Sequence, residues 1–310
     1  MRIHKPNYMP IAGIAATIIG ILLFPKDAFA WGPVAHLDFA SQFVTGAAAL
    51  TPTLMKLIQK YPFDFYYGTH AADMIIGKNR AKQHDHCHSW SQAGSLWKKS
   101  LNSTDEQLAF MLGYIGHLGA DVVAHNYIVP QMLIVHYKRK GVGHLYWEAR
   151  ADQRILAINP SLKDLWKELS QIRFPSHDAF LSKNLVPALV PNKLSARLYS
   201  HSLAVQRAST WRHAMEQIDK RSRLLFDQND LLNWRNLAIN LAGKAMKNPT
   251  SATLNELDPT GKKALKSATL YRKALRRKNS SDKDKQALQK MYDRALRKVT
   301  TVHIGAFEQD

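Results

Sequence analysis

Histidines and carboxylates recur along this sequence at spacings that suit metal binding. One run reads His117-x3-Asp121-x3-His125, and His144-x3-Glu148 repeats the arrangement further along. Residues four apart lie one turn apart on the same face of a helix, so each run would form a single stripe. Imidazole nitrogen and carboxylate oxygen are both ligands that zinc accepts. The two runs therefore predict a metal site built on helices.

The first 30 residues read as a secretion signal. They contain early basic residues, the apolar run Ile11–Phe24 and a small-residue cleavage site, Ala28-Phe29-Ala30. Cleavage after Ala30 would make Trp31 the amino terminus and would free its amino group as a ligand. An uncleaved signal anchor is the alternative. We expect an exported protein, periplasmic or extracellular.

Further candidate ligands precede the helical runs. Together with the amino terminus, they give enough candidate ligands for a cluster of metal ions. The candidates are Trp31, His36, Asp73, His86, His88, His117, Asp121, His125, His144 and Glu148. A single histidine on an apolar helix face is more often a hydrogen-bonded core residue than a ligand, so the conjunction carries the prediction. Cys87 is either a soft ligand or points away while its neighbours bind.

At these residues the chain resembles the zinc-dependent phospholipase C family, whose fold is shared with single-strand-specific zinc nucleases. The resemblance implies an all-α, multi-helix bundle around a trinuclear zinc site. Carried over by position, it implies these ligand sets: Trp31, His36 and Asp121 for one ion; Asp73, His117, Asp121 and either His86 or His88 for the second; His125, His144 and Glu148 for the third. Asp121 would bridge the first two ions.

The chain departs from both groups in places. The spacing His-x3-Asp-x3-His is shorter than in secreted bacterial phospholipases C and looks like the branch that includes glycosylphosphatidylinositol-specific phospholipase D. The interval from Trp31 to His36 resembles the nucleases. Glu148 resembles the phospholipases, and Val122-Val123-Ala124-His125 stands where nucleases carry Gln-Pro-Leu-His. The phospholipase side of the resemblance fits better.

The implied metals suggest a mechanism. Two zinc ions about 3.5–4 Å apart can bind the non-bridging oxygens of a phosphodiester and lower the pKa of a bridging water toward about 7. The zinc-bound hydroxide would attack phosphorus in line, and the third zinc would stabilise the leaving alkoxide. Asp73 is the best candidate for the catalytic carboxylate, because a carboxylate can combine ligand and base roles.

The pattern along the chain is helical, without sustained alternation of period two. The expected helices are Pro33–Leu50, Pro52–Tyr61, Ser89–Leu101, Thr104–Tyr137, His144–Ile158, Ser161–Ile172, Ser195–Leu225 and Leu231–Met246. Ser103-x-x-Glu106 predicts a capping box for the longest of them.

The aromatic cluster at positions 61–67 predicts core packing, with a wall of a substrate cleft as the alternative. The single cysteine excludes a disulfide within the chain, so stability would come from the core and the metals.

The C-terminal part of the sequence is strongly basic. Residues Lys262–Lys298 carry 14 Lys and Arg against three Asp, in a chain of net charge +19. We expect a helical phosphodiesterase domain at 31–255 and a basic helical extension at 256–310, with two amphipathic helices joined at Asn279-Ser280-Ser281. The extension would pack on the body as a solvated hairpin or attract an anionic membrane surface. Nucleic acid would be attracted equally well.

These observations predict an exported, monomeric, three-zinc phosphodiester hydrolase, with a phospholipid or another phosphodiester as substrate. A phospholipase C acting on headgroups is the first choice. The alternatives are a single-strand-specific nuclease of the same fold and a non-catalytic, zinc-stabilised surface-binding protein. The sequence leaves open the headgroup preference and whether cleavage is of the C or the D type.

Overall fold

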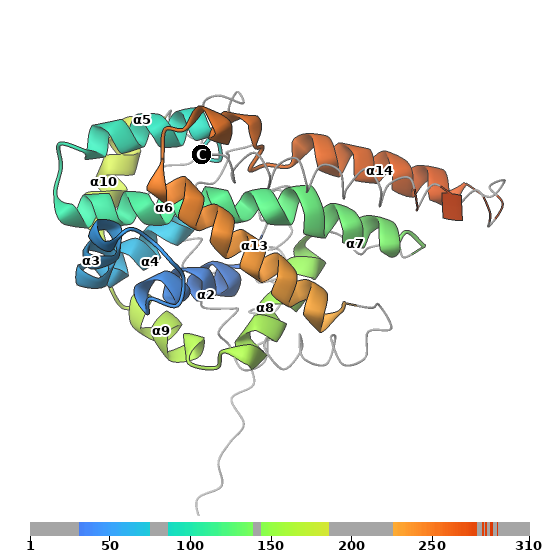
Figure 1. Cartoon of the computed structure of the whole chain (residues 1–310), viewed down its shortest axis with the longest axis horizontal. Coiled ribbons are helices and arrows are strands. Elements are labelled where there is room, and N and C mark those ends of the chain that lie inside the picture. The colour runs from blue at the N-terminus through green and yellow to red at the C-terminus, as the bar shows by residue number, and fades with distance from the viewer. Residues whose placement is uncertain are drawn as a thin grey trace, which may run out of the picture.

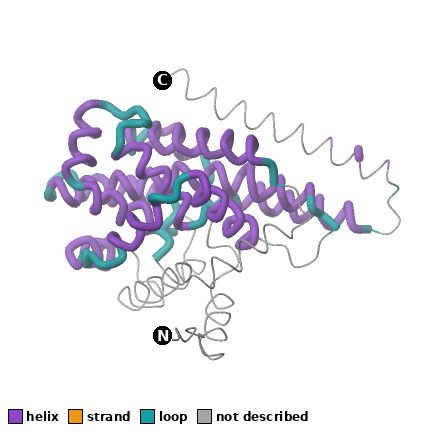
Figure 2. Tube along the Cα trace, turned by 90° about the horizontal axis from the view of Figure 1, so that it is seen from below, coloured by secondary structure: helices purple, strands orange, loops and turns teal. Residues whose placement is uncertain are grey.

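A computed structural model describes residues 31–74, 86–138, 144–185 and 226–277, with a few isolated positions beyond. Helices and loops make up these ranges and no strand occurs in them (Figure 2), so the all-α prediction is confirmed. The predicted signal peptide and the helix expected at Ser195–Leu225 lie outside the described residues.

A long apolar helix runs through the centre of the protein (Figure 1). It consists of α6 (Asp105–Val123), the π turn η3 (Ala124–Ile128) and α7 (Val129–Val135). By length and composition the whole stretch would suffice to cross a membrane, but 94% of its most apolar window is buried inside the protein. Burial on all sides explains why this helix is apolar around its whole circumference. The helix forms the core of the protein.

The π turn interrupts the single helix that the sequence predicted at Thr104–Tyr137. Pro130 accounts for it, because proline lacks the N–H that would bond Asn126 and its ring collides with that carbonyl. The helix compensates with a wider turn, in which the Val129 N–H donates to the Ala124 carbonyl. The Asn126 side chain donates to the Val122 carbonyl at 2.9 Å. His125 lies inside this turn, and π turns frequently occur at functional sites.

The N-terminal cap of α6 is also displaced from the predicted position. Thr104, and not Ser103, is the N-cap, and its hydroxyl accepts from the Gln107 N–H at 3.3 Å. The predicted capping box was therefore wrong by one residue. The cap type is unchanged, because serine and threonine both supply the oxygen that the first turn needs.

Shorter helices surround the central one. They are α2 (Pro33–Val44), α3 (Pro52–Lys60), α4 (Pro62–Ala71), α5 (Trp90–Ser100), α8 (His144–Ile158), α9 (Leu162–Leu169), α10 (Pro175–Asn184) and α13 (Gln228–Lys247). Helices α4 and α10 were not predicted from the sequence, although both begin with a proline at the first helical position. In α4 the run of aromatic residues obscured the helical period; Phe65 and Tyr66 are buried, as core packing predicted.

Two glycines bring α4 and α6 into close contact. A Cβ on Gly68 would lie 2.0 Å from the Phe110 carbonyl oxygen, and one on Gly113 would lie 2.2 Å from the Phe65 carbonyl oxygen. Only glycine permits so close an approach of two backbones. Because α4 and α6 touch here, Asp73, in the turn that follows α4, lies beside His117. His117 is one helical turn after Gly113 on α6.

The basic helix α14 (Lys262–Arg276) lies alongside α7 and extends with it away from the body (Figure 1). Ala268 and Leu275 are buried between the two helices, where they share a small second core with Val129, Leu133 and Ile134. The first helix of the predicted extension is thus present and packed. Apart from isolated positions, its expected second helix lies outside the described residues.

Candidate metal centre

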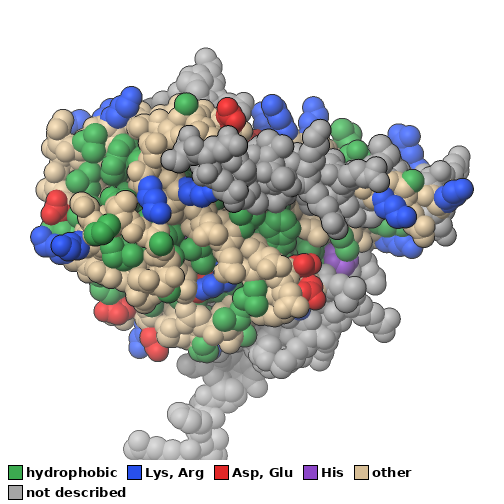
Figure 3. Space-filling model, in the orientation of Figure 1, with side chains coloured by type: hydrophobic (Ala, Val, Ile, Leu, Met, Phe, Trp, Pro, Cys, Tyr) green, Lys and Arg blue, Asp and Glu red, His purple; other side chains and the backbone are tan. Residues whose placement is uncertain are grey.

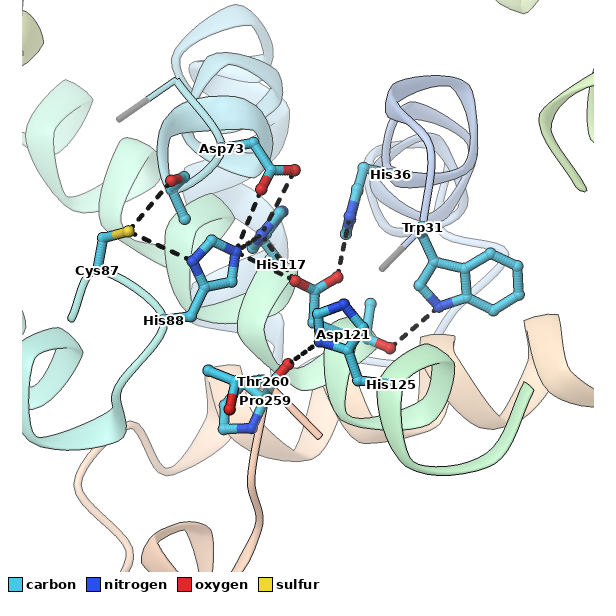
Figure 4. Close-up of polar contacts among 12 residues, drawn as sticks. Trp31, His36, Asp73, Cys87, His88, His117, Asp121, His125, Pro259 and Thr260 are labelled. Carbon is cyan, nitrogen blue, oxygen red and sulfur yellow. Dashed lines mark hydrogen bonds and ion pairs between the residues drawn. The ribbon is translucent and has the colours of Figure 1, made fainter. Parts of the chain in front are cut away.

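Five of the predicted ligands converge in the core from four separate segments (Figure 4). His36 comes from α2, Asp73 from the turn after α4, His88 from the turn before α5, and His117 and Asp121 from successive turns of α6. None of the five is more than 5% exposed. Such a concentration of buried polar side chains is costly unless each is compensated.

Asp121 lies at the centre of the cluster. Its Oδ1 is 3.2 Å from His36 Nε2, and its Oδ2 is 3.1 Å from His117 Nε2 and 3.3 Å from His88 Nε2. The two carboxylate oxygens therefore face different imidazoles. This is the arrangement that a carboxylate bridging two metal ions requires.

Asp73 lies on the far side of the same histidines. Its Oδ1 is 3.2 Å from His88 Nε2, and its Oδ2 is 3.9 Å from His117 Nε2. The side-chain ligand atoms of His36, Asp73 and His117 all fall within 4.8 Å of one another, as do those of His88, His117 and Asp121. Asp73 and Asp121 thus enclose one space between them.

The tautomer of His117 directs a lone pair into this space. Its Nδ1 lies 2.8 Å from the Thr69 carbonyl oxygen, which can only accept, so Nδ1 carries the proton. Its Nε2 then faces His88 Nε2 at 3.1 Å. Two ligand atoms bound at about 2.0–2.1 Å in a tetrahedral zinc site are separated by roughly 3.3 Å. The observed separations suit a shared zinc ion.

The charges in the cluster also favour a cation. Burial, together with His117, lowers the pKa of His36, although Asp121 opposes the shift. Burial alone would raise the pKa of Asp121, whereas positive charge at His117 and hydrogen bonds from His117, His36 and His88 lower it well below its usual range. With the lone pair of His117 Nε2 turned toward Asp121, a metal ion between them would supply that positive charge. His36 is therefore neutral, the form that binds metal, while Asp121 is ionised. His36 Nε2 and both Asp121 oxygens have no hydrogen bond of good geometry within the described part of the chain.

The geometry distinguishes His88 from His86. His88 Nε2 faces both aspartates, whereas His86 is partly exposed and its Nδ1 accepts a hydrogen bond from the His88 N–H at 3.0 Å. Cys87 is buried beside them, with Sγ 3.4 Å from the Ala72 carbonyl oxygen and 3.4 Å from His88 Nδ1. The structure therefore brings His88, rather than His86 or Cys87, to the aspartates.

The predicted third ion has fewer described ligands. His125 and Glu148 are both buried, on η3 and α8 respectively. His144 begins α8, but its side chain lies outside the described residues. His125 Nδ1 lies 2.6 Å from the Pro259 carbonyl oxygen, which fixes the proton on Nδ1 and leaves Nε2 as the ligand atom.

Residues just after the predicted domain boundary support His125. Asn126 donates to the Asp258 carbonyl at 2.7 Å, and Trp90 Nε1 donates to the Leu257 carbonyl at 3.1 Å. The Asp258 carboxylate closes the turn by accepting from the Thr260 N–H at 2.9 Å and the Lys262 N–H at 2.9 Å. The start of the expected C-terminal extension is therefore part of the site's support.

A substitution at Gly261 should test this support. Gly261 has φ +57°, and a Cβ there would lie 2.4 Å from the His125 Cβ and from its carbonyl oxygen. We expect Gly261→Ala to displace His125 and weaken the binding of one zinc ion about 10–100-fold, as loss of ligand support typically does. Zinc titration of the metal-free protein would measure the effect.

Gly46→Ala is the matched control. Gly46 also has a positive φ, +78°, but a Cβ there would meet nothing within 4 Å. It should carry the backbone penalty of a left-handed alanine alone. Equal zinc affinities in the two variants would show that the turn does not position His125.

Trp31 is held at the edge of the cluster. Its indole Nε1 donates to the Ala120 carbonyl at 3.0 Å, and its ring meets Phe39 edge-on at a centroid distance of 5.0 Å. The residue is 1% exposed. Its indole is thereby held against α6 at Ala120, the residue before Asp121.

Three supporting groups were not predicted from the sequence. The Thr69 and Pro259 carbonyls carry no sequence signal, because any residue supplies a carbonyl and only the fold brings it to a histidine. Asp152 was detectable: it follows His144 and Glu148 at the same interval of four, on the same face of α8. It is buried and binds the first turn of α2.

The described residues form an all-helical fold around a buried histidine–aspartate cluster whose ligand atoms could hold metal ions. The sequence profile described as zinc dependent phospholipase C matches residues 35–202, more than half of the chain. The chain therefore belongs to the zinc-dependent phospholipase C family, as its ligand motifs predicted. The match includes every predicted ligand except Trp31. Searches of curated proteins and of solved structures gave no match.

Proposed function

We propose that the mature protein is an exported, zinc-dependent phosphodiester hydrolase of the phospholipase C type. The observation that carries the proposal is the position of Asp121, whose two oxygens face different imidazoles at 3.1–3.3 Å. The family membership supports the hydrolase class, and the signal-like first 30 residues support export. We infer three ions, with Trp31, His36, Asp121, Asp73, His88, His117, His125, His144 and Glu148 as ligands.

The residues of the site would have separate roles in the reaction. Zinc bound here would supply a Lewis acid for the phosphodiester oxygens and acidify a water. Asp73, whose oxygens lie at the edge of the cluster, would orient that water and accept its proton. Asp121 would hold the spacing between two metal positions. The carbonyls of Thr69 and Pro259 would keep His117 and His125 in the tautomer that binds metal.

A panel of substrates would test the proposal. Protein beginning at Trp31 and loaded with zinc would be incubated with phosphatidylcholine, phosphatidylethanolamine and single-stranded DNA. We expect diacylglycerol and a phosphorylated headgroup from at least one lipid. Phosphatidic acid would instead indicate cleavage of the D type.

Two other results would contradict the proposal. Hydrolysis of DNA alone would support the nuclease alternative. Zinc binding without hydrolysis of any substrate would support a structural, surface-binding role. Asp73→Asn provides the inactive control, because it keeps the shape of the side chain and removes its charge.

We also propose that α14 attracts anionic membrane surfaces. Its exposed side chains include Lys262, Lys263, Lys266, Lys273 and Arg276, and Leu270 is 57% exposed among them. Figure 3 shows Lys and Arg side chains gathered on the protruding end of this helix. Basic residues near an anionic surface contribute up to ~1 kcal/mol each.

Removing this charge should weaken vesicle binding at least about tenfold, because a loss of about 1.4 kcal/mol has that effect. The variant is Lys262→Gln, Lys263→Gln, Lys266→Gln and Lys273→Gln. The control removes the same number of positive charges from α3 and α5: Lys56→Gln, Lys60→Gln, Lys98→Gln and Lys99→Gln. Cosedimentation with phosphatidylglycerol vesicles at low and high salt would measure the vesicle binding of each variant. Equal binding by both variants would leave α14 as a solvated helix.

A further inference from the structure

The start of α2 is capped from a distant helix. Gly32 occupies the N-cap position and has no side chain to accept the first N–H groups of the helix. Pro33 at the first helical position contributes no N–H. The next two amides donate to Asp152 on α8: Val34 N–H to Oδ2 at 3.2 Å and Ala35 N–H to Oδ1 at 3.0 Å. The Ala35 N–H is shared with the Gly32 carbonyl at 3.1 Å.

The fit between this carboxylate and the turn is close. A Cβ on Gly32 would lie 2.1 Å from Asp152 Oδ2 and 2.3 Å from its Cγ, so the carboxylate occupies the space that any other residue would need. Asp152 is only 6% exposed. Burial raises the pKa of Asp152 to about 7, while the hydrogen bonds from the Ala35 and Val34 amides oppose the shift, so these two amides are what stabilises the carboxylate in this buried position.

The anchored turn lies between two predicted ligands. Trp31 precedes Gly32, and His36 follows Ala35 by one residue. The indole of Trp31 is already held by the Ala120 carbonyl on α6. Asp152 holds the other side of the same turn through the Val34 and Ala35 amides.

We propose that Asp152 is a positioning residue for the zinc ion predicted at Trp31, His36 and Asp121. It acts by holding the first turn of α2 through the Val34 and Ala35 amides. The inference rests on the proposed function and adds a residue outside the predicted ligand set. It also gives a reason for the spacing of His144, Glu148 and Asp152, which follow one another at intervals of four residues on α8. This face of the helix would bind one zinc ion directly and would support another ion through α2.

The test compares Asp152→Ala with wild type, both processed to begin at Trp31. We expect the first zinc to bind about 10–100-fold more weakly, as when a partner of a metal ligand is removed. The other ions should bind as in wild type, and kcat should fall while KM stays. In the metal-free protein, amide exchange at Val34 and Ala35 should become faster.

Asp38→Asn separates positioning from general destabilisation. Asp38 is a fully buried carboxylate on the same helix, paired with Arg235 at 2.5 and 3.1 Å. This variant should unfold more easily yet keep the affinity for every zinc ion. Loss of the same zinc in Asp38→Asn would show that any weakening of α2 suffices, and would overturn the proposal.

A double-mutant cycle gives a second, independent result. Gly32→Ala should push the carboxylate away and weaken the same zinc site. With Asp152→Ala already present the space is free, so adding Gly32→Ala should cost little more. Additive losses would contradict the proposal. Wild-type protein that binds no zinc would overturn the proposed function itself, whereas unchanged zinc affinity in Asp152→Ala would overturn this inference alone.

Discussion

An Asp121→Asn variant is expected to lose more than one zinc ion and nearly all hydrolysis. The amide keeps the size of the side chain but has one oxygen and no charge, so it could not bind a metal ion beside His36 and a second one beside His88 and His117. Metal ions supply several kcal/mol of transition-state stabilisation. Since about 1.4 kcal/mol is tenfold in rate, hydrolysis should fall at least about 1,000-fold. Elemental analysis and a phosphodiesterase assay would measure both effects.

Two controls define the meaning of that result. His125→Ala should lose mainly one ion, because His125 is proposed as a ligand of the third ion alone, together with His144 and Glu148. Asp178→Asn should lose none, since Asp178 accepts from the Tyr67 hydroxyl and is not one of the predicted ligands. A full zinc complement in Asp121→Asn would refute the bridging assignment, and loss of all metal in His125→Ala would refute the partition into sites.

Extra residues before Trp31 are expected to abolish the first zinc site. An acylated peptide nitrogen is a poor ligand, whereas a free amine can bind zinc. Trp31 is buried and its indole donates to the Ala120 carbonyl, so the nitrogen that a preceding residue would acylate belongs to a residue held against α6. We expect one zinc fewer per chain and hydrolysis reduced at least about 100-fold, equivalent to about 2.7 kcal/mol.

The comparison needs protein expressed without its first 30 residues and with a removable tag before Trp31. A protease that leaves Trp31 as the first residue should restore both the zinc and the rate in the same sample. Full activity with the tag attached would show that the amino terminus is not a ligand. The ligand set would then begin at His36.

Local spacing carried most of the information about the site. His117 and Asp121 share a face of α6 because they lie one helical turn apart, and the structure gives them a 3.1 Å contact. The central helix was also predictable, since an apolar stretch of this length needs burial on all sides. Its π turn was not predicted, although Pro130 was the available signal.

Groups that act through tertiary contact could not be predicted in the same way. The choice of His88 over His86 depends on how the turn before α5 meets α6, and that turn has no periodic pattern. The support of His125 by residues 257–261 joins segments more than 130 positions apart. The capping of α2 by Asp152 spans 117 positions. Spacing on one helix carries no information about which other helix it meets.

Zinc held by this cluster is proposed to make the protein a phosphodiester hydrolase. The most direct measurement is the rate of lipid hydrolysis by metal-free protein, beginning at Trp31, as zinc is added in equivalents of the chain. We predict negligible hydrolysis without zinc and a rise that reaches its plateau at three equivalents. Hydrolysis that is already complete without zinc, or zinc that binds fully with no hydrolysis, would contradict the account.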